Sequence, residues 1–408
     1  MRRYALAGAG ARALRQFALP LAEQYTESAV LAGVYDLNPA RAVYVARACG
    51  SVPAFADFDE MLRVTRPDCV IVATVDRTHH DYIIRALDAG CEVISEKPLT
   101  VDAEKCRAIL AAERRCGRRV LVTFNLRFVP YVTRVKELLR AGAIGRVLNV
   151  DLEWHLDRRH GADYFRRWHR RKENSGGLLV HKATHHFDMI NWWLDEEPER
   201  VFAFGTRRFY GPTRAERGER CSTCRHTATC DFYVDYADDP LLRDLYFAAE
   251  AHDGYYRDRC VFDEEIDIED TMTVAVRYAG GAQLSYSLVA YSPYEGWRAT
   301  LTGTEGRLEV GIVQSGPDAE TESDVITVYD ARGGRSHHSI PRAAGEHGGA
   351  DVMLRDRLFG TGARPDPLSH MAGSRAGALS MLIGAAANQS METGLPANIA
   401  DLLAERAS

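Results

Sequence analysis

The hydrophobic pattern over the first third of the chain alternates short apolar runs with amphipathic stretches. The apolar, β-branched runs predict strands over residues 4–7, 29–35, 69–73, 92–94 and 120–124. Helical stretches fill the gaps, and those over 82–89 and 103–116 are closed by Gly90 and Gly117, as a C-terminal cap prefers. Parallel strands need such crossovers. The pattern therefore predicts a doubly wound α/β domain over residues 1–125.

Beyond residue 145 the pattern changes to longer extended runs. They cover residues 146–154, 271–278, 282–289 and 300–302, with one strongly helical passage between them. This pattern predicts a large, mostly antiparallel sheet with helices on one face, so residues 126–408 form an α+β domain. The stretch 368–388 is rich in Ala, Gly and Ser and predicts a closely packed helix docked on the body of the protein.

Length and charge narrow the classes of function. A chain of 408 residues exceeds the roughly 250–300 residues that one core sustains, which supports two domains. A net charge of -6 offers no basic surface for nucleic acid. The sequence contains no apolar run of about 20 residues, so we expect no membrane span, a cytoplasmic location and a small-molecule partner.

A glycine pattern directly after the first predicted strand indicates a dinucleotide site. Gly8 permits the tight turn, Gly10 and Ala11 bring backbone amides to a pyrophosphate, and Ala13 allows close packing of helix on strand. Arg12 lies in the same turn. Because this context is that of a Rossmann domain, we predict NAD as the cofactor.

Asp36 ends the second predicted strand, where a carboxylate accepts hydrogen bonds from the adenosine ribose and repels a 2′-phosphate. This position favours NAD over NADP. In the alternative interpretation, Asp36 with Asn38 behind it only caps the next helix, and Arg12 and Arg41 accommodate a phosphate.

Several motifs in combination resemble the Gfo/Idh/MocA family, which includes glucose-fructose oxidoreductase and inositol dehydrogenase. These are the segment 70–79, the triplet Glu96-Lys97-Pro98, Arg127 with Pro130, the pair Gly176-Gly177 before a helix with His185, and the late segment 303–306. The resemblance covers nearly the whole chain. It implies an oxidoreductase acting on a hydroxyl or carbonyl of a sugar, glycoside or cyclitol. We also expect this chain to form a homo-oligomer, a dimer or a tetramer.

The resemblance also assigns roles to residues. Lys97 is implied to hydrogen-bond the reacting oxygen, and its place at the end of a parallel strand suits that task, although a lysine is otherwise most often a solvated charge. Thr74, His79 and Glu96 are implied to join the cofactor site, and Arg127 is assigned to the substrate. A lysine partly desolvated beside the nicotinamide has a lowered pKa and suits proton transfer.

The helical passage 177–188 supplies the other half of the predicted site. With His185 pointing into the cleft, His181 and Lys182 fall on the same helix face, so we predict His185 as acid/base, His181 as a second catalytic group and Lys182 as a substrate contact. The family commonly places Asp where this chain has His181, which leaves the proton relay open. Alternatives are a merely structural His181, or a metal held by His181, His185 and Asp188.

A basic run with interleaved aromatics covers residues 158–172, directly before this helix. It is interpreted either as a solvated face or as a surface that holds an anionic substrate such as a uronate or sugar phosphate. The aromatic and acidic residues of 255–257, 263–270 and 294–297, together with Tyr291, are predicted to wall the substrate pocket.

Four of the nine cysteines are clustered, within a predicted insertion over about residues 214–262. Cys221, Cys224, Cys230 and Cys260 suit tetrahedral zinc, so we predict structural zinc. His226 replacing Cys260, an iron-sulfur cluster and free thiols are the alternatives.

Two further functions compete with a dehydrogenase. The first is a redox-neutral glycoside hydrolase that holds NAD tightly and uses transient oxidation to eliminate the leaving group. The second is an NAD-sensing or scaffolding protein, against which the presence of both Lys97 and His185 argues.

Overall fold

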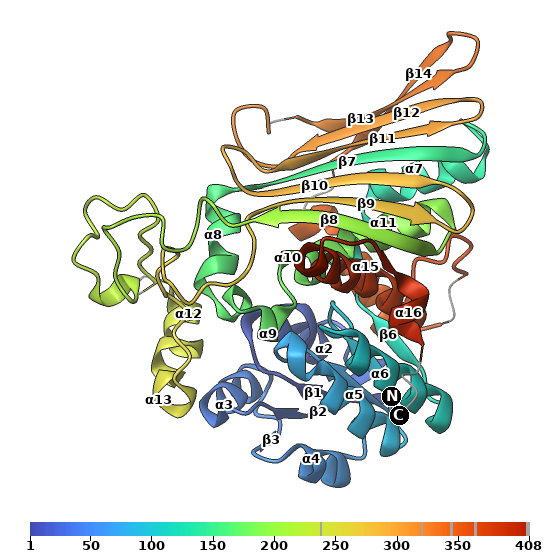
Figure 1. Ribbon diagram of the computed structural model, residues 1–408. Coiled ribbons are helices and arrows are strands. Elements are labelled where there is room, and N and C mark those ends of the chain that lie inside the picture. The colour runs from blue at the N-terminus through green and yellow to red at the C-terminus, as the bar shows by residue number, and fades with distance from the viewer. Residues whose placement is uncertain (237–238, 320, 343–345, 363–364, 405–408) are drawn as a thin grey trace.

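The computed structural model describes residues 1–408 except 237–238, 320, 343–345, 363–364 and 405–408, and places two sheets on either side of a helical layer (Figure 1). The first sheet has the order β15-β6-β5-β4-β1-β2-β3. Its parallel strands are β1 (Arg2–Ala7), β2 (Ala29–Tyr35), β3 (Ala54–Phe55), β4 (Cys69–Val72), β5 (Glu92–Ser95) and β6 (Val120–Val122). The predicted strands and the doubly wound Rossmann fold are confirmed.

Local signals in the sequence place the helices of this domain. A helical run over 11–23 is made of α1 (Ala11–Ala13), η1 (Leu14–Ala18) and α2 (Leu19–Glu23), and the other helices are α3 (Pro39–Ala48), α4 (Phe58–Thr65), η2 (Asp76–Thr78), α5 (His79–Asp88) and α6 (Ala103–Cys116). The side chains of Asn38, Asp57 and Asp102 cap α3, α4 and α6. Gly117, with φ +62°, ends α6 as predicted.

The second sheet has the order β14-β13-β12-β11-β7-β10-β9-β8-β16. Its strands are β7 (Val147–Asp157), β8 (Pro198–Thr206), β9 (Thr271–Tyr278), β10 (Gln283–Ser292), β11 (Gly296–Gly303), β12 (Gly306–Val313), β13 (Ser323–Asp330), β14 (Arg335–Pro341) and β16 (Ala397–Asn398). All neighbours are antiparallel except β7 and β10. The predicted large, mostly antiparallel sheet is confirmed.

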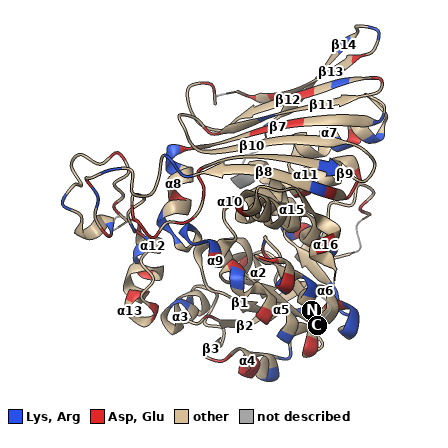
Figure 2. Cartoon of the chain, in the orientation of Figure 1, with Lys and Arg blue, Asp and Glu red and all other residues tan. Residues whose placement is uncertain are grey.

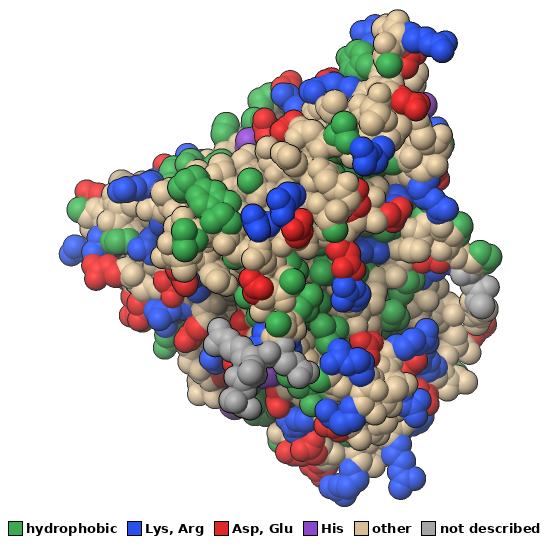
Figure 3. All heavy atoms as spheres, turned by 45° about the vertical axis from the view of Figure 1, so that its right-hand side comes forward, with side chains coloured by type: hydrophobic (Ala, Val, Ile, Leu, Met, Phe, Trp, Pro, Cys, Tyr) green, Lys and Arg blue, Asp and Glu red, His purple; other side chains and the backbone are tan. Residues whose placement is uncertain are grey.

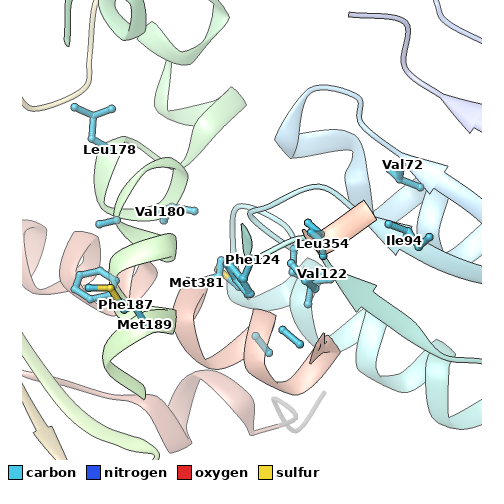
Figure 4. Close-up of a cluster of buried hydrophobic side chains, with 14 of the residues drawn as sticks. Val72, Ile94, Val122, Phe124, Leu178, Val180, Phe187, Met189, Leu354 and Met381 are labelled. Carbon is cyan, nitrogen blue, oxygen red and sulfur yellow. The ribbon is translucent and has the colours of Figure 1, made fainter. Parts of the chain in front are cut away.

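Helices between the two sheets join them into one body. They are η3 (Asn125–Phe128), α7 (Pro130–Arg140), α8 (Arg158–Arg166), η4 (Trp168–Arg170), α9 (Lys172–Ser175), α10 (Leu178–His181), α11 (Ala183–Leu194), α15 (Ser374–Thr393) and α16 (Ile399–Leu403). Figure 4 shows apolar side chains running from the first sheet, with Val72 and Val122, past Phe124 and Met381 to Phe187 on α11. Burying this apolar surface stabilises the contact between the sheets.

Segments from the end of the chain also pack on the Rossmann domain. The strand β15 (Ala372–Gly373) runs antiparallel to β6 at the edge of the first sheet. After η7 (Glu346–Gly349), α14 (Ala350–Phe359) lies against β1, where Tyr4 donates a hydrogen bond to the Leu358 carbonyl (3.1 Å) and its ring meets Phe359 edge-on. The two halves of the chain are therefore interlocked.

The inserted segment, which we define as residues 207–270 between β8 and β9, leaves the second sheet and reaches down to α3 (Figure 1). It contains η5 (Cys221–Thr223), α12 (Pro240–Leu245), η6 (Phe247–Ala249) and α13 (Glu250–Asp253). Within the described part of the chain, no helix combines the length and apolar character that spanning a membrane requires. On the face shown in Figure 3, acidic and basic side chains are interspersed.

Candidate active site

The glycine-rich turn has the geometry of a dinucleotide site. Gly8 has φ +96°, and a Cβ there would lie 2.4 Å from the Ala73 carbonyl oxygen, so only glycine fits. Gly10 precedes the helical run 11–23 in extended conformation, which presents the Ala11 amide at the N-terminal end of that run. Ala13 is buried against the sheet. The residues present therefore fit the diphosphate of NAD.

Asp36 is tied to that turn and does not cap α3. Its carboxylate accepts hydrogen bonds from the backbone amides of Ala9 and Asn38, both at 2.7 Å. The cap of α3 is Asn38, whose side-chain oxygen accepts from the Ala40 and Arg41 amides. The capping interpretation of Asp36 is therefore wrong. Arg41 lies 3.5 Å from Asp36 and is also paired with Asp253 of the inserted segment, so two carboxylates face its charge.

Arg12 links the turn to two carboxylates. Its guanidinium donates to Glu96 at 2.9 Å and to both oxygens of Asp351 on α14, at 3.1 and 3.3 Å. The Glu96 carboxylate also lies 3.3 Å from the Lys97 amide. Asp351 belongs to the far end of the chain, and the motif carries no signal of it. Because Arg12 is engaged by two acids, it is poorly placed to attract a 2′-phosphate.

His79 and Thr74 hold the loop that follows β4. The buried His79 ring contacts the Pro98 carbonyl at 2.8 Å and the Thr74 carbonyl at 3.2 Å, and burial lowers its pKa. Thr78 donates its hydroxyl hydrogen to Thr74. This histidine therefore connects the turn after β4 to the turn that carries Lys97.

Lys97 lies directly beyond the end of β5, at the carboxyl edge of the parallel sheet. Its Nζ donates to the backbone carbonyl of His181 over 3.1 Å, which joins the two domains at this point. Burial lowers the pKa of Lys97 to about 8, and the Asp76 carboxylate acts in the opposite direction. A lysine in this state exchanges a proton readily near neutral pH.

His181 forms a pair with Asp76, a partner that sequence reasoning missed. His181 Nδ1 and Asp76 Oδ2 share a hydrogen bond of 2.5 Å, and both side chains are buried. Burial and the neighbouring Lys97 push the pKa of His181 well below its usual value, while burial raises that of Asp76. The one available signal was the place of Asp76 beyond the end of β4, beside Lys97 in the sheet.

The predicted continuous helix over 177–188 is broken. α10 ends at His181 and α11 begins at Ala183, with Lys182 between them. Lys182 lies over the Trp154 ring, its Nζ 5.6 Å from the ring centroid, and burial lowers its pKa. The His185 ring, partly exposed, meets Phe124 edge-on at 5.8 Å. The break lets His181 face Asp76 across the domain boundary.

Two residues predicted to contact substrate are engaged elsewhere. Arg127 forms a buried, bidentate pair with Asp188 at 2.7 and 2.8 Å and donates to the Ser369 carbonyl. Tyr291 stacks on Phe209 at 4.4 Å, and its hydroxyl lies 2.9 Å from that of Thr271. Both contacts hold secondary structure together, and the assignment of these two residues to the substrate stays a prediction.

The basic run before α10 is largely not a solvated face. Arg166, His169 and Arg170 are buried. The His169 ring stacks on Trp168 at 3.7 Å and meets His181 edge-on at 4.2 Å. Figure 2 shows Lys and Arg gathered around α8 and α9 beside the inserted segment. The basic run therefore extends to the surroundings of His181, which its residue His169 contacts.

A second polar chain begins near the same point. His160 contacts Glu295 at 2.8 Å through Nδ1 and the Tyr164 hydroxyl at 3.1 Å through Nε2. The Tyr164 ring in turn lies 5.5 Å from His181. Glu295 belongs to the segment 294–297, which was predicted to wall the substrate pocket. It is thus connected to His181 through His160 and Tyr164.

The prediction of structural zinc is corrected. All four cysteines border one small void, yet within the described ranges no three His, Cys, Asp or Glu side chains are grouped so that they could hold a metal ion. Cys221 Sγ accepts a hydrogen bond from Arg166 at 3.2 Å, and Cys224 Sγ accepts from the His226 amide. The described cysteines are free thiols, which was the alternative left open. The same finding leaves the proposed metal at His181, His185 and Asp188 without support.

The fold and the site define a two-domain oxidoreductase with a Rossmann cofactor domain. Two family descriptions match the chain: "Oxidoreductase family, NAD-binding Rossmann fold" over residues 2–124 and "Oxidoreductase family, C-terminal alpha/beta domain" over residues 136–399. The chain belongs to the Gfo/Idh/MocA oxidoreductase family. It is therefore an oxidoreductase with an NAD-binding Rossmann domain, as the resemblance implied.

Relatives match nearly the whole chain or less than half of it. A Bacillus subtilis (strain 168) protein named as the oxidoreductase YteT is 39% identical over 408 residues, with 94% of each chain covered. An inositol 2-dehydrogenase of Rubrobacter xylanophilus is 30% identical over 181 residues, 43% of this chain and 48% of that protein. The WlbA dehydrogenase of Bordetella pertussis, solved with NADH and UDP-GlcNAcA, shares the fold with a TM-score of 0.66 at 20% identity and covers 98% of each chain.

Proposed function

We propose that this enzyme transfers hydride between NAD and a hydroxyl or carbonyl of a sugar, glycoside or cyclitol, with Lys97 and His185 handling the proton. The observation that carries this proposal is the buried junction of Lys97, His181 and Asp76 at the carboxyl edge of the Rossmann sheet. Ligands of open α/β sheets bind at that edge. NAD supplies the hydride acceptor or donor at nicotinamide C4.

The chain's own groups divide the remaining work. Lys97, with its pKa near 8, hydrogen-bonds the reacting oxygen and takes or returns its proton. The His181–Asp76 pair positions Lys97, because the lysine is anchored on the His181 carbonyl and faces the Asp76 carboxylate. His185, four residues after His181 and on α11, is the second acid/base group. Lys182 provides a further cation for a substrate oxygen.

The proposal predicts NADH formation from the correct polyol. Purified protein supplied with NAD and a panel of free sugars, cyclitols and aryl glycosides should give rising absorbance of NADH with at least one member. NADP should be a poorer acceptor, because Asp36 lies beside the glycine-rich turn, where the adenosine ribose is expected, and both Arg12 and Arg41 are paired with acids. Absence of NADH formation and of any other conversion across the panel would contradict the proposal.

The same assay tests a second candidate function, a redox-neutral glycoside hydrolase. The contact of the inserted segment with the glycine-rich turn favours it, since such an enzyme keeps its cofactor through the reaction. Release of the aglycone from an aryl glycoside, without net NADH and without added NAD, would identify the hydrolase. NADH accumulation would identify the dehydrogenase.

The pH dependence of oxidation should report on Lys97. Turnover in the direction of alcohol oxidation needs neutral Lys97, so it should rise with pH through an apparent pKa at or below about 8. The Asp76 carboxylate raises the pKa of Lys97. Asp76→Asn should therefore move this rising limb to lower pH, in addition to lowering turnover. If the rising limb of the kcat profile stays in place or moves to higher pH in Asp76→Asn, Lys97 is not the titrating group.

Oligomeric state and location complete the proposal. We propose a homo-oligomer, dimer or tetramer, that uses the face of the second sheet opposite α11 and α15. On this face β9 exposes every second residue, and the large apolar side chains of Phe204 and Val325 are exposed. Because the nine cysteines are free thiols, as in a reducing compartment, we propose the cytoplasm.

A further inference from the structure

The inserted segment touches the glycine-rich turn at the point where a diphosphate is expected. The Tyr246 hydroxyl, just beyond α12, accepts a hydrogen bond from the Ala11 amide over 2.9 Å. It also lies 3.4 Å from where a Cβ on Gly10 would stand. In Rossmann domains this glycine and the amides beside it receive the phosphate oxygens. Tyr246 therefore occupies a position that a phosphate oxygen takes when the cofactor is bound.

A guanidinium with unused hydrogen-bond donors lies on the same tyrosine. Arg257 stacks on the Tyr246 ring, with Cζ 4.5 Å from the ring centroid. Its side chain is 11% exposed, and its Nε and Nη1 atoms are buried without a hydrogen-bond partner among the residues that the structure describes. Buried donors are almost always satisfied, and charged ones cost more than neutral ones when they are not. These donors therefore indicate an anionic ligand.

The local charge balance supports the same conclusion. Among the described residues, the carboxylate that lies within ion-pair distance of Arg257 is that of Asp163, 4.0 Å from Nη2. Asp163 already pairs with Arg167 at 2.9 Å. Within the described part of the chain, two guanidiniums thus share one carboxylate, and one positive charge is left over in a buried place, where an unpaired charge is strongly unfavourable. An anion between the inserted segment and the glycine-rich turn offsets it.

We propose that the inserted segment forms the outer wall of the cofactor site, with Arg257 binding the diphosphate of NAD. Tyr246 holds the Ala11 amide until the cofactor enters. Further contacts keep the segment in place: Asn38 donates to the Ala249 carbonyl over 2.9 Å, and Arg41 pairs with Asp253. NAD cannot leave this enclosure unless the segment moves, so the cofactor dissociates slowly. This inference concerns cofactor binding and holds whichever substrate the enzyme uses.

Binding measurements on the full-length protein test the proposal without any substrate. Dissociation of NADH is followed by fluorescence after a chase with excess NAD, and equilibrium affinities are measured for NADH and for ADP-ribose, which keeps the diphosphate but lacks the nicotinamide. Arg257→Gln should weaken both affinities roughly 10- to 100-fold, the effect of one charged hydrogen bond. It should also speed release of NADH, and Arg257→Lys should restore part of the loss.

The control is Arg225→Gln, the same charge change at an exposed site of the same segment. It should leave NADH affinity and release unchanged. Tyr246→Phe removes only the hydroxyl that occupies the amide and should speed NADH association without weakening its affinity. Melting temperatures of all variants identify any that fails to fold, in which case Arg257→Lys carries the test.

The proposal is overturned if folded Arg257→Gln binds NADH and ADP-ribose like Arg225→Gln. Weakened binding of an acidic sugar with unchanged NADH affinity would overturn it as well, because Arg257 would then hold a substrate carboxylate. A failure of this kind leaves the proposed hydride transfer untouched. Conversely, loss of all substrate turnover with intact NADH binding would reject only the proposed function.

Discussion

Replacing Lys97 with methionine should lower turnover by roughly 10²–10⁴-fold, the usual contribution of a positioned acid or base. Methionine matches the lysine side chain as far as Cε but lacks the Nζ that contacts the His181 carbonyl. Affinity for NADH should stay within a few-fold of the parent protein, because the diphosphate is held at the glycine-rich turn. Steady-state kinetics with the best substrate of the panel and direct NADH titration give both values.

His185→Ala should cause a loss of similar size. Because the two groups act on one reacting oxygen, the double variant should be little worse than the poorer single variant, the non-additivity expected of a working unit. Lys105→Met on α6, a lysine that is paired with Asp102, serves as the control and should retain full turnover. Near-parental turnover of Lys97→Met, or losses that simply multiply, would show that this pair has been misassigned.

Replacing Arg127 with methionine should destabilise the protein by about 3–5 kcal/mol, the cost of leaving one half of a buried ion pair uncompensated. The Arg127 side chain is 7% exposed and that of Asp188 is 2% exposed. The variant leaves the Asp188 carboxylate buried between η3 and α11 without the Arg127 charge. It also removes the hydrogen-bond donor to the Ser369 carbonyl. The measurement is the midpoint of urea unfolding, with circular dichroism as the probe of the transition.

The double variant Arg127→Met/Asp188→Leu removes both charges and should recover a substantial part of this loss. Arg277→Met, which breaks the exposed pair with Glu199, is the matched control and should change the midpoint little. If Arg127→Met unfolds like the parent protein but raises the KM for substrate, the original assignment of Arg127 to the substrate would be restored.

Features encoded over short distances were predictable. The strands of the Rossmann domain, the caps of its helices and the glycine-rich turn all depend on residues within a few positions of each other. Lys97 was found for the same reason, since its place follows from a strand end and a three-residue motif. The second sheet was predicted from its long extended runs, but its strand order was not, because strand order depends on pairing across the chain.

Features that depend on long-range contacts were missed or misassigned. Asp76 meets His181 across 105 residues, and Asp188 pairs with Arg127 across 61. The cysteine spacing suggested zinc, but the folded segment turns Cys221 toward Arg166 instead. Residues adjacent in space here have no common local pattern that a single sequence could reveal.

The sequence by itself therefore determined the cofactor domain, because hydrophobic periodicity, glycine conformation and helix capping are local properties of the chain. Its short motifs also carried the family resemblance that implied the class of protein. The tertiary structure alone decided which ionisable groups meet. It paired His181 with Asp76, closed Arg12 between Glu96 and Asp351, and brought Tyr246 of the inserted segment onto the Ala11 amide. The pKa of Lys97 and the charge around the cofactor follow from burial and from neighbours distant in sequence, so they exist only in the folded chain.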